Sequence, residues 1–479
     1  MNIREMGRLL RAGKVSSVEL VEEALQKANT SGRELNAFIT VDADSALETA
    51  QERDRELAAS IDRGPLHGIP TAHKDLFYTR NLRTTGGSLI YRDFIPDHDA
   101  TPVEKLAVAG AVSIGKTNLH ELAYGITSKN PHYGFVHNAR DPERIPGGSS
   151  GGSGTAIAAG IIPMSLGTDT GGSIRVPSSY CGVTGLKPTY GRVSRYGVLP
   201  LSYSFDHVGP LGSCVDDCAI ALSAIAGHDS RDASSATEPV PAYSAEPEKR
   251  LDGLKVGVPA NFFFRGIDAE VEAAVKAAIA AMVKLGAEAI EIQTPDIAAI
   301  NATQFVIMLA EVSALYVHER DAGRFSPGTW NLLEQGRLIQ ATEYVNAQRL
   351  RSIFRREFNA VWQQVHVLAV PSTPVTAPLI SDATVNINGV DEDVRMASTR
   401  LMRTANLLGD PALAMPCGKS KSGLPIGLQL IGAPFSEPLL LRLAGTLEAA
   451  LGWSALPFSR GRPDASMARQ PPSSDRTFL

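Results

Sequence analysis

The sequence predicts an α/β fold in which helices pack against both faces of a sheet. Three observations support this prediction. Short apolar runs typical of buried strands recur along the chain, stretches with helical periodicity separate them, and one segment has the pattern of a β-α-β unit. Strands that alternate with helices usually form one sheet between two helical layers, so we expect an α/β sandwich.

The N-terminal region is expected to be helical. Ser16 and Glu19 form a capping box ahead of an apolar stripe, and Gly32 follows as a stop signal. A second helical pattern covers residues 44–61.

The composition changes between residues 64 and 210. This stretch is dense in Gly, Ser, Thr and Pro and contains short apolar runs at 109–114 and 161–166. Short strands joined by glycine-rich connections have this pattern, and so do sites where the backbone approaches a ligand.

The second half of the chain returns to regular patterns. A helix is expected at 215–226, and a polar surface loop rich in Asp, Ser, Pro and Glu at 227–250. Strands at 254–259 and 289–292, joined by a helix that Asp268 caps, form the β-α-β unit. The remaining expected elements are a long helical region at 302–365, a strand at 367–370, a hairpin turn at Asn388 and Gly389, a strand at 425–431 and a helix at 437–451.

Length and composition set the broad class. The chain has 479 residues, of which 43% are apolar and 20% charged, so it can bury a large core. We expect one domain over residues 1–463 and a loose tail at 464–479. The formal net charge of -5 comes without a basic stripe, so no nucleic-acid partner is expected.

Cysteine and histidine usage argues against a metal enzyme. The four cysteines form no C-x-x-C pair, and neither they nor the ten histidines show zinc-ligand spacing, so we expect no metal and no cofactor. The N-terminus lacks the apolar run of a signal peptide, and no apolar run approaches about 18 residues. We therefore expect a cytoplasmic protein without a membrane partner.

Three segments carry the candidate chemistry: HGIPTAHKD at 67–75, PGGSSGGSGT at 146–155 and TDTGGSIRVP at 168–177. Gly171 and Gly172 would let the backbone N–H groups of a turn point inward and stabilise an oxyanion. A serine beside such a turn still needs a base. Lysine serves as one only if burial or its neighbours lower its pKa enough to leave the amine neutral.

These segments resemble the amidase-signature family. The resemblance is continuous from residue 64 to residue 210, includes GKTNLHELAYG, and persists more weakly in SSVELVEEALQK and LPIGLQLIGAPFSE. It implies one α/β/α sandwich with a large mixed, mostly parallel sheet of about eleven strands, covered by helices. It also implies an amidohydrolase that cleaves a C–N acyl bond through a serine acyl-enzyme.

The resemblance assigns a Ser–cis-Ser–Lys triad. Ser173, the last residue of GTDTGGS, is the expected nucleophile, Ser149 the bridging serine after a cis peptide bond, and Lys74 of HKD the base. We expect Lys74 to draw a proton from Ser173 through Ser149, after which Ser173 attacks the amide carbonyl. The expected oxyanion hole consists of the backbone N–H groups of Thr170, Gly171, Gly172 and Ser173.

Three further residues of these segments have expected roles outside the triad. Asp169 and Arg175 are expected to tie the glycine turn to the strand end. His73 stands where many relatives have a small apolar residue, so it either tunes the lysine or fills space beside it, and we favour packing.

Other interpretations use the same residues. The pattern G-x-S-x-G would make Ser149 the nucleophile of a Ser-His-Asp α/β-hydrolase esterase, but no downstream histidine lies in a recognisable context. GGSSGGSGTAIAAG could cradle a phosphate, but it lacks the Walker lysine and the Rossmann spacing. An S-x-x-K pattern ends at Lys116 without its companion motifs, and we expect Lys116 at a strand end.

Two functions remain open within the family. One is a stand-alone amidohydrolase for an amide, anilide, carbamate or ester, and the other is the A subunit of a glutamyl-tRNA or aspartyl-tRNA amidotransferase. LPLSYSFDHVGP and STRLMRTANLLGDPALAMPCG resemble the stand-alone enzymes, which we favour. The expected partner is a small-molecule amide or carbamate, and a homodimer is left open.

The substrate pocket is expected from residues near the base and from AYGITS. Its wall would be apolar and partly aromatic, which favours an aryl or alkyl substrate over a charged amino acid. An arginine at position 320, 337 or 349 is a candidate for binding a substrate carboxylate. The predicted lining residues are Leu76, Phe77, Tyr124, Gly125, Ile126, Thr127 and Cys181, with side chains from the helical region near 307–316.

Overall fold

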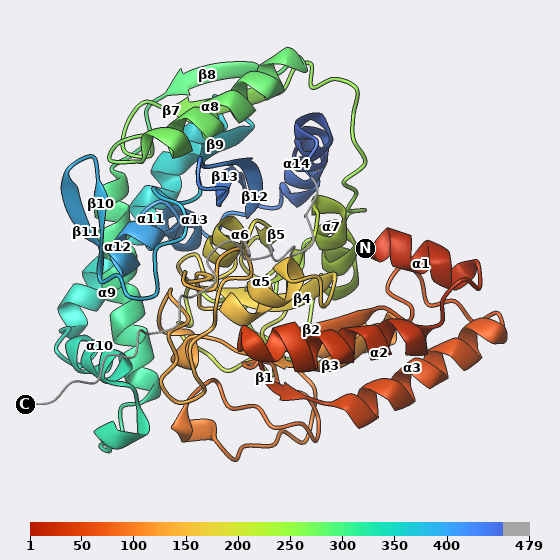
Figure 1. Ribbon diagram of the computed structural model, residues 1–479. Coiled ribbons are helices and arrows are strands. Elements are labelled where there is room, and N and C mark those ends of the chain that lie inside the picture. Colours follow the sequence, from red (N-terminus) through yellow and green to blue (C-terminus); the bar gives the residue numbers. More distant parts are fainter. Residues whose placement is uncertain (454–479) are drawn as a thin grey trace, which may run out of the picture.

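The computed structural model describes residues 1–453, and its centre is one sheet of eleven strands (Figure 1). In spatial order the strands are β1 (Phe38–Val41), β3 (Val112–Thr117), β2 (Pro70–Lys74), β4 (Met164–Asp169), β6 (His207–Gly212), β5 (Thr184–Lys187), β12 (Ala412–Lys419), β13 (Pro425–Gly432), β9 (Val367–Pro371), β7 (Lys255–Pro259) and β8 (Glu288–Ile292). The predicted turn at Asn388 and Gly389 joins a separate hairpin, β10 (Thr384–Ile387) and β11 (Val390–Asp393).

The predicted α/β/α sandwich with a large mixed sheet is confirmed, but the sheet is not mostly parallel. Six of its ten neighbouring strand pairs are antiparallel and four are parallel. The connection from β12 to β13 shows one reason for the difference. Residues 420–424 join these strands directly, and two strands joined by so short a connection must run antiparallel.

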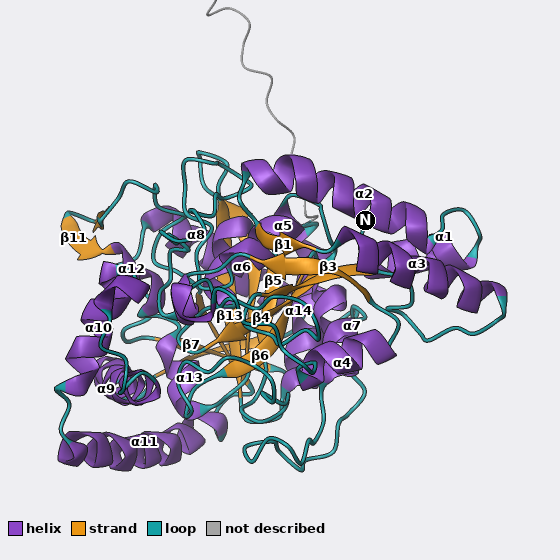
Figure 2. Ribbon diagram, turned by 90° about the horizontal axis from the view of Figure 1, so that it is seen from below, coloured by secondary structure: helices purple, strands orange, loops and turns teal. Residues whose placement is uncertain are grey.

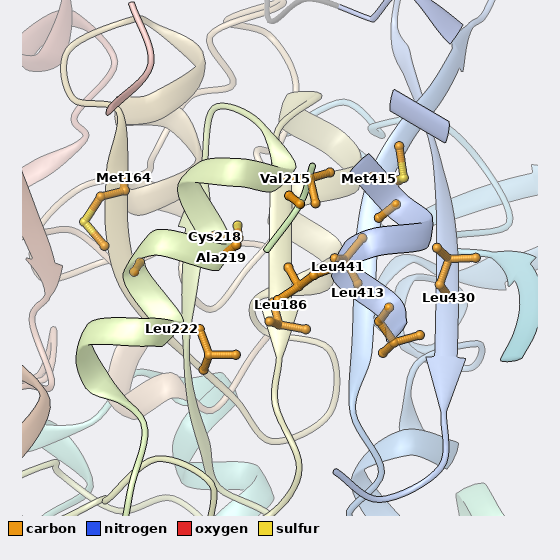
Figure 3. Close-up of a cluster of buried hydrophobic side chains, with 14 of the residues drawn as sticks. Met164, Leu186, Val215, Cys218, Ala219, Leu222, Leu413, Met415, Leu430 and Leu441 are labelled. Atoms are coloured by element: carbon orange, nitrogen blue, oxygen red, sulfur yellow. The ribbon is translucent and has the colours of Figure 1, made fainter. Parts of the chain in front are cut away.

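Helices cover the sheet on both faces. Figure 3 shows how α7 and α14 pack apolar side chains on β4, β5, β12 and β13, with Leu222 and Leu441 among them. Helices α5 and α6 contact strands of the same central region and belong to separate apolar clusters. The helices are α1 (Ile3–Arg11), α2 (Ser17–Lys27), α3 (Ala43–Ala58), α4 (Thr101–Val108), α5 (Gly151–Ala158), α6 (Arg175–Cys181), α7 (Val215–Ile225), α8 (Ala269–Lys284), α9 (Ile297–Leu315), α10 (Pro327–Arg337), α11 (Ala341–Trp362), α12 (Val394–Thr399), α13 (Arg403–Leu408) and α14 (Glu437–Leu451).

Most elements predicted from periodicity are present. The Ser16–Glu19 capping box begins α2, Asp268 caps α8, and β7 and β8 pair in parallel as the predicted β-α-β unit. No helix or strand lies between α7 and β7, as expected for the polar loop at 227–250. The predicted tail at 464–479 lies outside the described residues.

The long helical region predicted at 302–365 consists of three helices, α9, α10 and α11, which lie together at one side of the molecule (Figure 2). Among residues 1–453, only α9 is long and apolar enough to cross a membrane by length and composition. It packs against α10, α11 and α13. Helix α9 is apolar because it packs against these helices of the domain.

Candidate active site

Two parallel strands bring the first and third motifs to the same edge of the sheet. Lys74 is the last residue of β2, which pairs in parallel with β4 so that His73 lies opposite Leu166. Strand β4 ends at Asp169, and the glycine turn follows at once. Because both strands end at this edge, the Lys74 side chain and the turn are neighbours.

The second motif lies between them. Lys74 Nζ is 2.7 Å from Ser149 Oγ and 2.7 Å from Thr168 Oγ1, and these hydroxyls are its hydrogen-bond partners in the described part of the chain. The peptide bond between Gly148 and Ser149 is cis, as the resemblance implied. Lys74 and Ser149 are both fully buried.

Burial sets the charge state of Lys74. Desolvation lowers the pKa of the ammonium to about 7, although the negative charges of Asp206 and Asp169 act to raise it. At neutral pH a substantial fraction of the amine is therefore uncharged and offers a lone pair. A lysine in this state can accept a proton from a serine hydroxyl.

Ser173 lies in the turn that follows β4. The Ser150 N–H donates to the Ser173 carbonyl oxygen at 3.2 Å, and Ser150 Oγ donates to the Thr168 carbonyl oxygen at 3.3 Å. These two bonds join the GGSS segment to the GTDTGGS segment, so Ser149 and Ser173 belong to one compact cluster. Ser173 is 5% exposed and lines a cavity, whereas Ser149 and Lys74 are fully buried and do not line it.

A buried ion pair holds the glycine turn. Arg175 donates to both carboxylate oxygens of Asp169, at 2.8 and 2.9 Å, and neither side chain is exposed. Asp169 also accepts from Asn406 at 2.8 Å and from the Ile174 N–H at 3.2 Å. The arginine and amide contacts lower the pKa of the Asp169 carboxyl, although burial alone would raise it. The pair therefore ties the turn to the strand end, as predicted.

The same carboxylate engages one of the four predicted oxyanion donors. The Gly172 N–H donates to Asp169 Oδ1 at 2.8 Å, a charge-assisted bond that takes this donor away from the cavity. The N–H groups of Thr170, Gly171 and Ser173 have no hydrogen-bond acceptor among residues 1–453. These three remain the candidates for binding an oxyanion.

The cavity in front of Ser173 has a volume of about 320 Å³. A larger cavity of about 920 Å³ lies near α1 and α14, and none of Lys74, Ser149 and Ser173 lines it. The smaller cavity is therefore the one that serves the serine cluster. Its lining includes His120, Tyr124, Gly125, Ile126, Thr170, Gly171, Ser173, Gln304, Phe305, Met308, Thr399 and Arg403.

The model of the family described as Amidase matches residues 19–441. The chain belongs to the amidase family. This extent covers the glycine turn, the lysine strand and most of the sheet, so the family relationship concerns the whole fold.

The relatives of this chain include proteins of two kinds. It is 41% identical to the A subunit of the glutamyl-tRNA(Gln) amidotransferase of Anaeromyxobacter sp. (strain K), over 94% of this chain and 96% of the relative. A structure described as a vestigial protein complex that reveals the origins of an s-triazine catabolic enzyme matches with a TM-score of 0.91 and 36% identity, covering 95% of this chain and 99% of its own. A crystal structure of an amidase matches with a TM-score of 0.85 and 35% identity, covering 94% and 99%.

Part of the predicted pocket lines this cavity. Tyr124, Gly125 and Ile126 do so, and α9 contributes as expected. Phe77 and Cys181 do not, because both are fully buried in apolar clusters of the core.

Two other predicted lining residues also lie elsewhere. Leu76 packs into the apolar cluster around Leu119, and it lines a different hollow. The Thr127 hydroxyl lies 3.4 Å from the His120 ring and does not line the cavity.

The predicted arginines lie outside the cavity, and two that the sequence analysis did not single out line it. Arg320 and Arg349 are exposed, and Arg337 stacks on a tryptophan ring. Arg395 and Arg403 line the cavity instead. The segment STRLMRTANLLG contains Arg403, but nothing in its pattern indicates that this arginine is buried at the site.

No histidine side chain of the described residues hydrogen-bonds to Lys74, Ser149 or Ser173. The Ser149 hydroxyl meets Lys74, whereas His207 is buried with its Nδ1 against the Phe205 carbonyl oxygen. Burial and the Lys116 charge lower the pKa of His73 to about 3, so its ring is neutral, and the packing role favoured from the sequence stays a prediction. Lys116 lies in β3 and pairs with a carboxylate, which fits the predicted strand-end position.

Proposed function

We propose that this chain is an amidohydrolase that uses Ser173 as nucleophile, Ser149 as proton relay and Lys74 as base. The observation that carries the proposal is the fully buried Lys74 amine, 2.7 Å from Ser149 Oγ and with hydroxyls as its partners. A buried amine without a carboxylate at its side is held close to neutral, which is the state that a base requires.

The proposed reaction has two halves. Lys74 accepts the Ser149 proton while Ser149 accepts the Ser173 proton, and Ser173 Oγ bonds to the amide carbon. The free N–H groups of Thr170, Gly171 and Ser173 stabilise the oxyanion. The relay then returns the proton to the leaving nitrogen, the C–N bond breaks, and water hydrolyses the acyl-enzyme by the same path.

The amidotransferase role is the second candidate. The 41% identity to a protein named as the A subunit of such an enzyme favours it, and the same serine chemistry would then release ammonia from glutamine. The match to a solved amidase supports the stand-alone enzyme. We keep the stand-alone amidohydrolase as the primary proposal.

The test is a hydrolysis screen with the purified full-length chain. Primary amides, anilides, carbamates and short esters are each offered alone, and glutamine is offered with and without the other amidotransferase components and charged tRNA. Turnover of a small amide by the chain alone supports the proposal. Glutamine hydrolysis that appears only with the other components supports the amidotransferase role instead.

A homodimer and a cytoplasmic location of the protein remain predictions. All four cysteines are free thiols.

A further inference from the structure

The cavity at Ser173 contains positive charge without a matching carboxylate. Arg395 and Arg403 are its charged lining residues, and no Asp or Glu of the described residues lines it. Arg395 is largely exposed and donates to the Asp393 carboxylate at 3.2 Å. Arg403 is only 7% exposed, so it is the charge that needs an explanation.

The partners of Arg403 among residues 1–453 are all neutral. Its guanidinium donates to Thr399 Oγ1 at 3.0 and 3.2 Å and to Gln304 Oε1 at 3.3 Å. It also lies over the Phe305 ring, 5.0 Å from the centroid. A buried cation is normally paired with an anion, and one held by neutral groups beside a cavity is poised to receive an anion from a ligand.

A second donor lines the same cavity. The Tyr124 side chain is 4% exposed, and its hydroxyl has no hydrogen-bond partner among the described residues. Buried hydroxyls are seldom left without a partner in proteins. An oxygen acceptor entering the cavity would satisfy this hydroxyl together with the guanidinium.

Gln304 shows that these donors are near the reacting serine. Its amide accepts from Arg403, and its Nε2 donates to the Thr170 carbonyl oxygen at 3.1 Å. One side chain therefore links Arg403 to the glycine turn. Ser173 and Arg403 line the same cavity of about 320 Å³, which suits a small substrate that carries both an amide and an anion.

We propose that Arg403 and Tyr124 form a subsite for a carboxylate on the substrate, so that the preferred substrate is a short amide that carries a carboxylate and no ammonium group. The absence of Asp and Glu from the described lining leaves an α-ammonium group without a partner, which disfavours free asparagine or glutamine. The inference rests on the proposed amide hydrolysis at Ser173. It also replaces the neutral aryl or alkyl substrate expected from the sequence.

The experiment compares three matched amides with the full-length chain by following ammonia release. Succinamate carries the carboxylate, butyramide replaces it with a methyl group, and asparagine adds an α-ammonium group to succinamate. The kcat/KM for succinamate should exceed that for the other two by about tenfold or more, the value of one charge-assisted hydrogen bond. The ratio should fall towards one in Arg403→Gln, mostly through KM, and should persist in the surface control Arg349→Gln.

The result that overturns the subsite is equal use of succinamate and butyramide by the wild type, or an unchanged ratio in Arg403→Gln. If Arg403→Gln does not fold, Tyr124→Phe removes one hydroxyl only and should still lower the ratio severalfold. An enzyme that hydrolyses amides without preferring succinamate loses the subsite and keeps the proposed function. A chain that hydrolyses no amide and takes no fluorophosphonate at Ser173 loses both.

Discussion

The amine of Lys74 and the hydroxyl of Ser149 lie 2.7 Å apart in a region that solvent does not reach. This contact depends on two features far apart in the sequence. Strand β2 delivers the lysine at its end, and the segment that leads into α5 delivers the serine. Burial lowers the pKa of the Lys74 amine and so makes this normally cationic residue a candidate base for Ser149, and the following predictions test that assignment.

The first prediction concerns pH. Because a base must be unprotonated to act, kcat/KM for a neutral amide should fall tenfold per pH unit on the acid side and level off above a pKa of about 7. The measurement is a pH profile with a substrate that does not titrate in this range. An acid limb near pH 4 would instead indicate a carboxylate as the base.

The second prediction concerns Lys74→Met, which keeps an unbranched side chain one heavy atom shorter and removes the amine. Turnover should fall by about 10²–10⁴-fold, the usual contribution of a general base. Thermal stability should not fall, because burial of the amine disfavours its charged form: with the folded pKa below the unfolded value, this group lowers stability at neutral pH, and the loss diminishes as pH rises towards the unfolded pKa. A variant that loses activity only because it unfolds at lower temperature would contradict this account.

Ser149→Ala tests the relay separately. Removing this hydroxyl should abolish most turnover, and combining it with Lys74→Met should add little, because groups that act as a unit give non-additive losses. Steady-state kinetics of the single and double variants check this. Losses that multiply would show that Ser149 and Lys74 act independently.

The Asp169–Arg175 pair should be important for stability. Asp169→Asn leaves the buried Arg175 without its anion, and breaking such a pair costs about 3–5 kcal/mol. Chemical denaturation should show a lower midpoint than the wild type. The surface pair Arg250–Asp252 is the matched control, and Asp252→Asn should have little effect because both side chains are exposed. Equal effects of the two substitutions would contradict the role given to Asp169.

Adjacent glycines of the turn should respond differently to alanine. Gly172 has φ +119°, and a Cβ there would lie 2.9 Å from the Met402 side chain, so Gly172→Ala should destabilise the protein by about 1–3 kcal/mol. Gly171 has no positive φ, and the nearest atom to a Cβ there is 3.8 Å away, so Gly171→Ala should keep the wild-type denaturation midpoint. Similar midpoints for the two variants would argue against this turn geometry.

The parts of the fold that follow local rules could be predicted from the sequence. Capping residues, a turn dipeptide and apolar periodicity gave α2, α8, the β10–β11 hairpin and the β7–β8 pair. Strand β12 was missed, and with it the short connection that makes its pair with β13 antiparallel. Other antiparallel pairs, such as β5 with β12, were missed because they join segments that are far apart in the sequence.

The candidate site, like the fold, could be predicted from the sequence only in part. The contact between Lys74 and Ser149 joins residues of recognisable motifs, so the resemblance could place it. The environment of Arg403 could not be placed, because Gln304 reaches it from a helix about a hundred residues earlier in the chain. The loss of the Gly172 donor could not be foreseen either, because it depends on how the Asp169 carboxylate turns.

The most direct test of the account is to identify the serine that carries the acyl group. The purified chain is treated with a fluorophosphonate, digested, and the modified residue is located by tandem mass spectrometry, with Lys74→Met in parallel. The account predicts modification of Ser173 in the wild type and much slower modification in Lys74→Met. Modification of Ser149 or Ser150, or equal rates in the two proteins, would contradict it.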